Sequence, residues 1–265
     1  MPAYGAYSTK MELTGATALV TGGDTGIGAA IVRALSARGA NVAIDYFGDA
    51  SPARALVSEL VAAGRKAAAF AGNVADASDV ANLVAQTVSA FGSLDVLVNN
   101  AGIEARYPFV DTPDDVWQRE IAVNLTGPFL CSRAAAKQMI AQGRGGRIVN
   151  VSSIHEDVTA PTNAPYCAAK GGVRMLMRTI AVELAPYAIT VNNVAPGAID
   201  TPMDAATKAN RKLDTELLDE IPLRRWGKPE EVAGLIAWLC GDEAAYVTGA
   251  TLVIDGGMMR QAGSL

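Results

Sequence analysis

Short apolar runs alternate along the chain with longer segments whose apolar residues recur at helical spacing. The runs have the length of β-strands and cover residues 16–20, 41–44, 67–70, 96–98, 148–151, 190–194 and 252–254. Because they are apolar on both faces, they predict the strands of a buried parallel sheet. Segments 29–38 and 53–63 predict helices, and Gly64 marks the expected end of the second.

Strands that alternate with helices form right-handed βαβ units. The sequence therefore predicts one α/β domain over residues 1–265, a single Rossmann-type, doubly wound parallel sheet with helices on both faces. Residues 203–222 are richer in charge than the rest of the chain and contain no strand pattern. We interpret them as a helical insertion that covers a site as a lid.

Composition and charge exclude several classes of protein. The 265 residues are half apolar, which is enough for a full core, and their formal net charge of −5 argues against nucleic acid as the partner. One histidine and three scattered cysteines do not supply the usual Cys/His ligands of a metal site. The cysteines are typical of free thiols in the cytoplasm. No signal peptide, anchor or membrane-spanning run is expected either.

Three glycines recur in the turn that follows the first predicted strand: Gly22, Gly26 and Gly28. In a strand–turn–helix unit they allow the tight turn, the approach of backbone to a pyrophosphate, and close packing of the helix on the sheet. The N–H groups at the helix start then bind phosphate. The sequence thus predicts a dinucleotide site, to which we also assign the remaining turn residues, Asp24, Thr25 and Ile27.

The spacing T-G-x-x-x-G-x-G resembles that of the short-chain dehydrogenase/reductase family, and further motifs similar to those of the family follow in order. They are Asn99-Asn100-Ala101-Gly102, Asn124, Ser152-Ser153, Tyr166-x-x-x-Lys170 and Pro196-Gly197-Ala198-Ile199-Asp200-Thr201. The resemblance spans nearly the whole chain and implies a nicotinamide dinucleotide cofactor and a homotetramer. It adds these residues to the expected cofactor site: Asn100, Ala101, Gly102, Tyr166, Lys170, Pro196, Gly197, Ile199 and Thr201.

Tyr166 and Lys170 are four residues apart, so a helix places both side chains on one face. A phenol ordinarily ionises near pH 10, and a neighbouring ammonium is expected to lower the pKa of Tyr166 toward the working range. The resemblance implies that Asn124, Ser153, Tyr166 and Lys170 form the catalytic set, with Tyr166 moving the proton. The family's 13-residue interval between serine and tyrosine selects Ser153 over Ser152. The expected reaction is reversible hydride transfer between an alcohol carbon and a nicotinamide.

Asp45, Tyr46 and Phe47 end the second predicted strand, where an acidic residue binds the ribose 2′-OH of NAD and an arginine accommodates the 2′-phosphate of NADP. Asp45 lies one place before the usual NAD-selecting aspartate of the family. Neither Phe47 nor Thr25 supplies a cation where NADP-dependent relatives carry one, so we favour NAD and leave NADP open. Asn73-Val74 resembles the family's D-V at the adenine, with Asn in place of Asp.

Glu104, in N-N-A-G-I-E, and His155, in S-S-I-H-E, follow strands at the same end of the predicted sheet. Within the family these motifs resemble the bacterial glucose 1-dehydrogenases. A carboxylate and an imidazole can hydrogen-bond sugar hydroxyls, so we expect Glu104, Ser153, His155 and Tyr166 to bind a small-molecule substrate. The expected reaction oxidises an aldose to its lactone. A purely structural His155, a reductase of a small ketone or 3-oxoacyl thioester, and a catalytically silent cofactor-binding protein are the alternatives.

Overall fold

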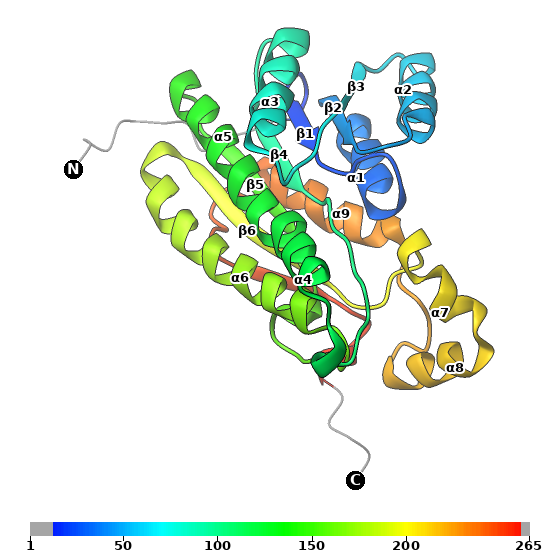
Figure 1. Ribbon diagram of the computed structural model, residues 1–265. Helices are drawn as coiled ribbons and strands as arrows, with labels where there is room; N and C mark the ends of the chain where they lie inside the picture. The colour runs from blue at the N-terminus through cyan, green and yellow to red at the C-terminus, as the bar shows by residue number, and fades with distance from the viewer. Residues whose placement is uncertain (1–12, 261–265) are drawn as a thin grey trace.

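A computed structural model of the protein describes residues 13–260; residues 1–12 and 261–265 of the predicted domain lie outside the described range. Seven parallel strands form one sheet in the order β3-β2-β1-β4-β5-β6-β7 (Figure 1). The strands are β1 (Thr17–Val20), β2 (Asn41–Tyr46), β3 (Ala67–Ala71), β4 (Val96–Asn99), β5 (Gly146–Val151), β6 (Ile189–Pro196) and β7 (Thr251–Ile254). The predicted doubly wound α/β fold is confirmed, and each of the seven predicted apolar runs overlaps one of these strands.

Helices cover both faces of the sheet (Figure 1). The helices in the described part of the chain are α1 (Gly26–Ala37), α2 (Ser51–Ala62), α3 (Ala77–Phe91), α4 (Asp114–Ile121), α5 (Gly127–Gln142), α6 (Ala164–Leu184), α7 (Ala205–Ala209), α8 (Arg211–Glu220) and α9 (Pro229–Cys240). Gly64, with a φ of +75°, follows the end of α2 as expected. A left-handed residue is common just beyond a helix, and glycine adopts that conformation without a steric penalty.

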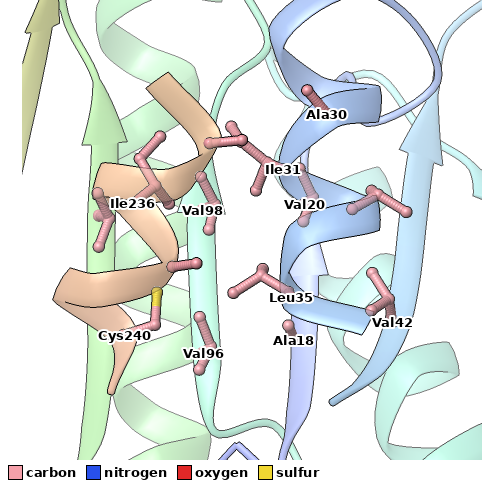
Figure 2. Close-up of a cluster of buried hydrophobic side chains, with 14 of the residues drawn as sticks. Ala18, Val20, Ala30, Ile31, Leu35, Val42, Val96, Val98, Ile236 and Cys240 are labelled. Carbon is pink, nitrogen blue, oxygen red and sulfur yellow. The ribbon is translucent and has the colours of Figure 1, made fainter. Parts of the chain in front are cut away.

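Two apolar clusters hold these layers together, one on each face of the sheet. Leu35 of α1 and Ile236 of α9 pack over Val20 of β1 and Val98 of β4 (Figure 2). Leu19, the neighbour of Val20, belongs to the opposite cluster under α3, α5 and α6. Successive residues of a strand point to opposite faces, so an all-apolar strand feeds both clusters. This double burial explains why the strands are recognisable in the sequence.

The segment 116–140 is helical but is not one continuous α-helix. Helix α4 is followed by a π-helical segment, Ala122–Thr126, and α5 begins only at Gly127. The Asn124 side chain lies in the π-helical segment and makes two hydrogen bonds to the backbone of Ile103. A π-helical turn inside a helix is frequently found at a functional site.

Residues 203–222 form no strand, in agreement with the sequence pattern. A short 3₁₀ turn, Pro202–Asp204, leads into α7 and α8, which project beyond the sheet (Figure 1). Asn210 caps α8, because its Oδ1 accepts hydrogen bonds from the N–H groups of Lys212 and Leu213. The pair of helices follows the carboxyl end of β6, the edge of a parallel sheet at which ligands bind in such folds.

Candidate active site

Helix α6 brings Tyr166 and Lys170 to the carboxyl end of β5. Both lie near the start of the helix, one turn apart. Lys170 is buried, its Nζ donates a hydrogen bond of 2.9 Å to the carbonyl of Val151, and the same Nζ lies 5.4 Å from the centre of the Tyr166 ring. The amine is therefore fixed between the last residue of β5 and the aromatic face of the tyrosine.

Ser153 hydrogen-bonds the Tyr166 hydroxyl, so the structure brings together the two residues that the 13-residue interval selects. Its Oγ also accepts a hydrogen bond of 3.2 Å from the N–H of His155. The neighbouring Ser152 is buried, and its Oγ has no hydrogen-bond partner within the described chain. Ser153 and Tyr166 thus place two hydroxyl groups where one substrate oxygen could contact both.

Burial is the main cause of the pKa shifts of Tyr166 and Lys170. It raises the pKa of Tyr166 above that of an ordinary phenol; the hydrogen bond from Ser153 opposes the rise, while Glu104 and Asp204 add to it. Burial also lowers the pKa of Lys170 to about 8, and the carboxylate of Glu156 opposes that fall. The expectation that Lys170 lowers the pKa of Tyr166 is therefore not met, because removing a phenolate from water outweighs an ammonium that lies over the ring.

Asn124 is fully buried, and its side chain hydrogen-bonds both backbone groups of one residue, Ile103. Its Oδ1 accepts a hydrogen bond of 2.9 Å from the N–H of Ile103, and its Nδ2 donates one of 2.8 Å to the carbonyl of Ile103. A Cβ at Gly102 would lie 3.2 Å from the same Oδ1. Asn124 therefore fixes the loop that leads from β4 to Glu104.

The glycine turn lies between β1 and α1, as predicted. Gly22 and Gly26 have φ values of +53° and +51°, which favour glycine. A Cβ at Gly28 would lie 2.1 Å from the carbonyl oxygen of Gly22, so no larger residue fits without a backbone shift. Asp24, Thr25 and Ile27 are at least partly accessible on the same turn.

The loop after β4 closes against this turn. Asn100 Nδ2 donates hydrogen bonds to the carbonyls of Thr21 and Gly22, at 3.0 and 2.8 Å. In return, the Thr21 hydroxyl accepts hydrogen bonds from the N–H groups of Asn100 and Ala101. The glycine turn and the N-N-A-G segment thus form one rigid edge at the β1–β4 junction, where the strand order reverses. Crevices at such a junction bind nucleotides in open α/β sheets.

Asp45 points toward the glycine turn rather than to solvent. It is 2% exposed, and its Oδ2 accepts a hydrogen bond of 3.2 Å from the N–H of Gly22. Burial raises the pKa of Asp45 to about 7, and the hydrogen bond from Gly22 opposes the rise. Tyr46 is partly buried, whereas Phe47 is 79% exposed. The carboxyl group therefore supports the turn, which makes any role in cofactor choice indirect.

The remaining predicted cofactor residues lie at the same edge of the sheet. Asn73 precedes α3 and accepts a hydrogen bond from the N–H of Ala75, and Val74 is buried. Pro196 ends β6, and the N–H of Gly197 donates to the carbonyl of Ile254. Ile199 is buried and pairs with Gly227, while the Thr201 hydroxyl donates a hydrogen bond of 3.0 Å to Asp204.

Glu104 and His155 are the other two predicted substrate residues, and each interacts with Tyr166: Glu104 through its charge and His155 through its ring. The side chain of Glu104 is 14% exposed, and its Oε1 accepts hydrogen bonds from Arg106 Nε and Asn163 Nδ2, at 2.9 and 2.6 Å. The His155 ring packs edge-on to the Tyr166 ring, with 6.3 Å between centres. His155 Nδ1 lies 3.2 Å from the carbonyl of Val158, which can only accept; Nδ1 therefore donates, and Nε2 of the neutral ring becomes an acceptor.

Comparison with known proteins identifies the family. The family model of enoyl-(acyl carrier protein) reductases matches residues 22–259. The L-rhamnose 1-dehydrogenase (NAD(P)(+)) of a Sphingomonas strain is 44% identical over 246 residues, which cover 93% of this chain and 97% of that protein. The chain belongs to the short-chain dehydrogenase/reductase family. The resemblance found in the sequence motifs is confirmed, and the protein is an oxidoreductase of this family.

Other relatives in the family differ in the substrates that their names give. Glucose 1-dehydrogenase 2 of Bacillus subtilis is 40% identical over 93% of this chain and 96% of its own length. A 3-oxoacyl-[acyl-carrier-protein] reductase of Synechocystis is 45% identical over 93% and 98%. The crystal structure of acetoin dehydrogenase from Enterobacter cloacae matches with a TM-score of 0.86 at 39% identity, over 94% of this chain and 98% of that one. These relatives establish the family but not the substrate, which has to be inferred from the residues of the site.

Three polar residues that hold the site or its loops in place were not found from the sequence of this short-chain dehydrogenase. Asn163 is 2% exposed and holds Glu104 in place. Glu120 is fully buried, and its Oε1 accepts a hydrogen bond of 2.7 Å from the N–H of Ala105. Asp204 begins the α7–α8 segment, and burial raises its pKa. None of these residues lies in a recognisable motif; only the acidic start of the charged segment offered a signal for Asp204.

The described residues add two negative findings about this family member. Within 13–260, no three side chains of His, Cys, Asp or Glu gather so that they could hold a metal ion. In the same range, no helix is both long enough and apolar enough to span a membrane. All three cysteines are free, and Cys131 and Cys240 are buried.

Proposed function

We propose that the protein is an NAD(P)-dependent dehydrogenase that oxidises a hydroxyl group of a sugar or polyol, with glucose and its oxidation to the lactone as the first reaction to test. The observation that carries the proposal is that the Glu104 carboxylate, held in place by Asn163, acts electrostatically on Tyr166, which hydrogen-bonds Ser153. We infer that it adds a hydrogen-bonding group for a polyol to an alcohol-binding site. Two relatives of similar length are named for reactions on L-rhamnose and glucose.

The glycine turn fits the dinucleotide. A Cβ at Gly22 would lie 3.0 Å from Ala101, so the turn is bare backbone packed against the N-N-A-G loop. When bound, the nicotinamide accepts or donates the hydride. The residues proposed to hold the cofactor are Gly22, Asp24, Thr25, Gly26, Ile27, Gly28, Asp45, Tyr46, Phe47, Asn73, Val74, Asn100, Ala101, Gly102, Tyr166, Lys170, Pro196, Gly197, Ile199 and Thr201.

NAD is the preferred cofactor in this proposal. Neither Thr25 nor Phe47 carries a positive charge, whereas a nearby arginine is the group that accommodates the 2′-phosphate of NADP. The kcat/KM for NAD should therefore exceed that for NADP when both are compared in steady-state kinetics with the same substrate. A clear preference for NADP would overturn the assignment.

The reacting groups have separate tasks. Tyr166 takes the proton of the substrate hydroxyl and returns it in the reverse direction. Ser153 holds the same substrate oxygen through its hydroxyl, which already contacts Tyr166. Lys170, whose ammonium lies over the Tyr166 ring, holds the nicotinamide ribose. Asn124 acts at a distance, because it fixes the loop that carries Glu104.

Replacing Glu104 or His155 with alanine is expected to raise the KM for the sugar by about tenfold or more, because each loses at least one hydrogen bond to a substrate hydroxyl. The KM for the cofactor should change less than about twofold. Glu59→Ala is the matched control, since Glu59 also pairs with an arginine, Arg33, but on the surface between α1 and α2. Unchanged sugar kinetics in both site variants would remove these residues from the substrate site.

Two alternatives are tested by the same assay. The 3-oxoacyl reductase among the relatives favours a thioester substrate, but the negative net charge and the acidic groups Glu104 and Asp204 near Tyr166 disfavour an acidic carrier. A binding protein without turnover is disfavoured by the assembled Asn124, Ser153, Tyr166 and Lys170. Following nicotinamide absorbance with aldoses, polyols, small ketones and a 3-oxoacyl thioester separates the three. Silence with all of them, while cofactor still binds, would favour the last.

The proposal extends to the organisation of the molecule. Residues 1–265 form one domain in the cytoplasm, and residues 203–222 act as its lid. Exposed apolar side chains on α4, α5 and α6 would be covered in a homotetramer: Trp117, Phe129, Met175 and Val182. Light scattering that gives a monomer at micromolar concentration would contradict the tetramer.

A further inference from the structure

Three buried asparagines lie side by side on neighbouring strands, below the candidate active site. Asn99 of β4 is in register with Asn150 of β5, which is in register with Asn193 of β6. Asn99 Nδ2 donates a hydrogen bond of 2.8 Å to Asn150 Oδ1, and Asn150 Nδ2 donates one of 2.9 Å to Asn193 Oδ1. Asn193 Nδ2 then donates, at 2.9 Å, to Glu156 Oε2. We call these four residues the amide ladder.

Glu156 sets the direction of the amide ladder. An ionised carboxylate only accepts hydrogen bonds, so Asn193 must turn its NH₂ group toward Glu156 and its oxygen toward Asn150. Because Asn193 presents its oxygen to Asn150, Asn150 must donate its NH₂ to Asn193 and present its own oxygen to Asn99. Asn99 then donates its NH₂ to Asn150. All four residues are at most 8% exposed. In such a dry setting, aligned amides polarise one another and the bond to the charged end is the strongest.

The same carboxylate ties the Ser153 turn to the sheet. Glu156 ends the 3₁₀ turn Ile154–Glu156, which begins directly after Ser153, and its N–H donates a hydrogen bond of 3.0 Å to the Ser153 carbonyl. Glu156 Oε1 accepts a hydrogen bond of 2.6 Å from the Thr251 hydroxyl on β7. One side chain therefore joins the loop that carries the substrate-binding serine to both β6 and β7.

The negative charge of Glu156 also acts on Lys170. The amine donates to the Val151 carbonyl, one residue beyond Asn150 of the ladder, and the Glu156 charge opposes the fall in the pKa of Lys170 that burial causes. Of the other charged groups, Arg174 on α6 has its Nε 3.7 Å from Glu156 Oε1 and also pairs with Asp157. The groups that β6 and β7 turn toward Glu156 are neutral, an amide and a hydroxyl.

We propose that Glu156 is a positioning residue: it ends the amide ladder and holds the Ser153 turn against β6 and β7. As a consequence of this placement, its negative charge acts on the buried Lys170 ammonium. The inference rests on the proposed roles of Ser153 and Lys170 and adds a residue to which the sequence motifs give no task. The amide ladder and the contacts with the Ser153 turn together explain why the Glu156 carboxylate is buried, although it is expected to contact neither substrate nor cofactor.

The test compares two substitutions at one contact. Glu156→Gln removes the charge and retains the shape of the side chain: its oxygen can still accept from Asn193, and its NH₂ can donate to the Thr251 hydroxyl. Thr251→Val removes one hydrogen bond and leaves the charge. The Cε resonance of Lys170, assigned with Lys170→Arg, reports its titration by NMR. We expect a midpoint lower by about one pH unit in Glu156→Gln and an unchanged midpoint in Thr251→Val.

Activity should follow the charge state of Lys170. With midpoints near 8 and near 7, Glu156→Gln should lower kcat about fivefold at pH 8 and less than about twofold at pH 6.5, relative to the unchanged protein. An unchanged Lys170 midpoint in Glu156→Gln, or an equal shift in Thr251→Val, would overturn the inference. The NMR readout needs no turnover. If the parent protein proves inactive, the proposed function is contradicted, but the Lys170 midpoint still tests the role of Glu156.

A second variant covers the case in which Glu156→Gln does not fold. Asn193→Ala removes the last rung of the amide ladder, frees Glu156 Oε2 and leaves all charges in place. We expect kcat to fall at least about threefold, with the KM for the sugar within about twofold, because the ladder orients reacting groups and does not contact substrate. An unchanged kcat would contradict the positioning role.

Discussion

Replacing Tyr166 with phenylalanine is expected to lower kcat for alcohol oxidation by about 10³-fold, the contribution typical of a positioned acid or base. The phenol is the proton-transfer group that contacts Ser153, and the Tyr166 side chain is only partly exposed to water. Phenylalanine keeps the ring that Lys170 and His155 pack against. The loss should therefore fall on kcat, while cofactor affinity, measured by calorimetry, changes only a few-fold.

Tyr246→Phe is the matched control for this substitution. Tyr246 is fully exposed on the surface, so removing its hydroxyl should leave kcat within about twofold of the parent value. A Tyr166→Phe protein that keeps a tenth or more of the parent kcat would show that another group transfers the proton. His155, whose ring lies against Tyr166, would then be the first candidate.

The fold could be predicted because its signals are local. The strands are short and largely apolar, so their positions can be read from adjacent residues. The break between α4 and α5 could not be found in this way. Its partner is the backbone of Ile103, which Asn124 meets only after the chain has folded. The spacing of apolar residues in a helix does not show whether a polar side chain hydrogen-bonds a distant loop or faces solvent.

The candidate site likewise contains residues that local spacing identifies and residues that come together only in the folded structure. Ser153, Tyr166 and Lys170 have a fixed spacing, and the structure brings them together as that spacing indicates. Glu156 and Asn193 are 37 residues apart in the chain and meet only through the sheet register. The pKa values depend on burial, which no motif encodes. For this reason the sequence assigned Lys170 the correct neighbour but the wrong effect on the pKa of Tyr166.

Gly28→Ala is expected to weaken cofactor binding by about 100-fold or more, because the new methyl group would occupy the contact between the turn and its support. Its Cβ would lie 2.1 Å from the Gly22 carbonyl oxygen and 2.6 Å from Asn100 Nδ2. Both neighbours are fixed, since Asn100 Nδ2 donates to that same carbonyl. The turn must move away from the N-N-A-G loop, and the N–H groups that would bind the pyrophosphate lose their common direction.

Titration of NAD into the variant, followed by calorimetry, measures the effect. Gly234→Ala in α9 is the control, because a Cβ there meets no atom within 4 Å. That helix-interior substitution should leave binding unchanged and stabilise the fold by about 0.5–1 kcal/mol. Overpacking at Gly28 should instead cost about 1–3 kcal/mol of unfolding free energy. If Gly28→Ala binds NAD as tightly as the Gly234→Ala protein, the glycine turn is not the phosphate site, and the cofactor must be held elsewhere along the carboxyl edge of the sheet.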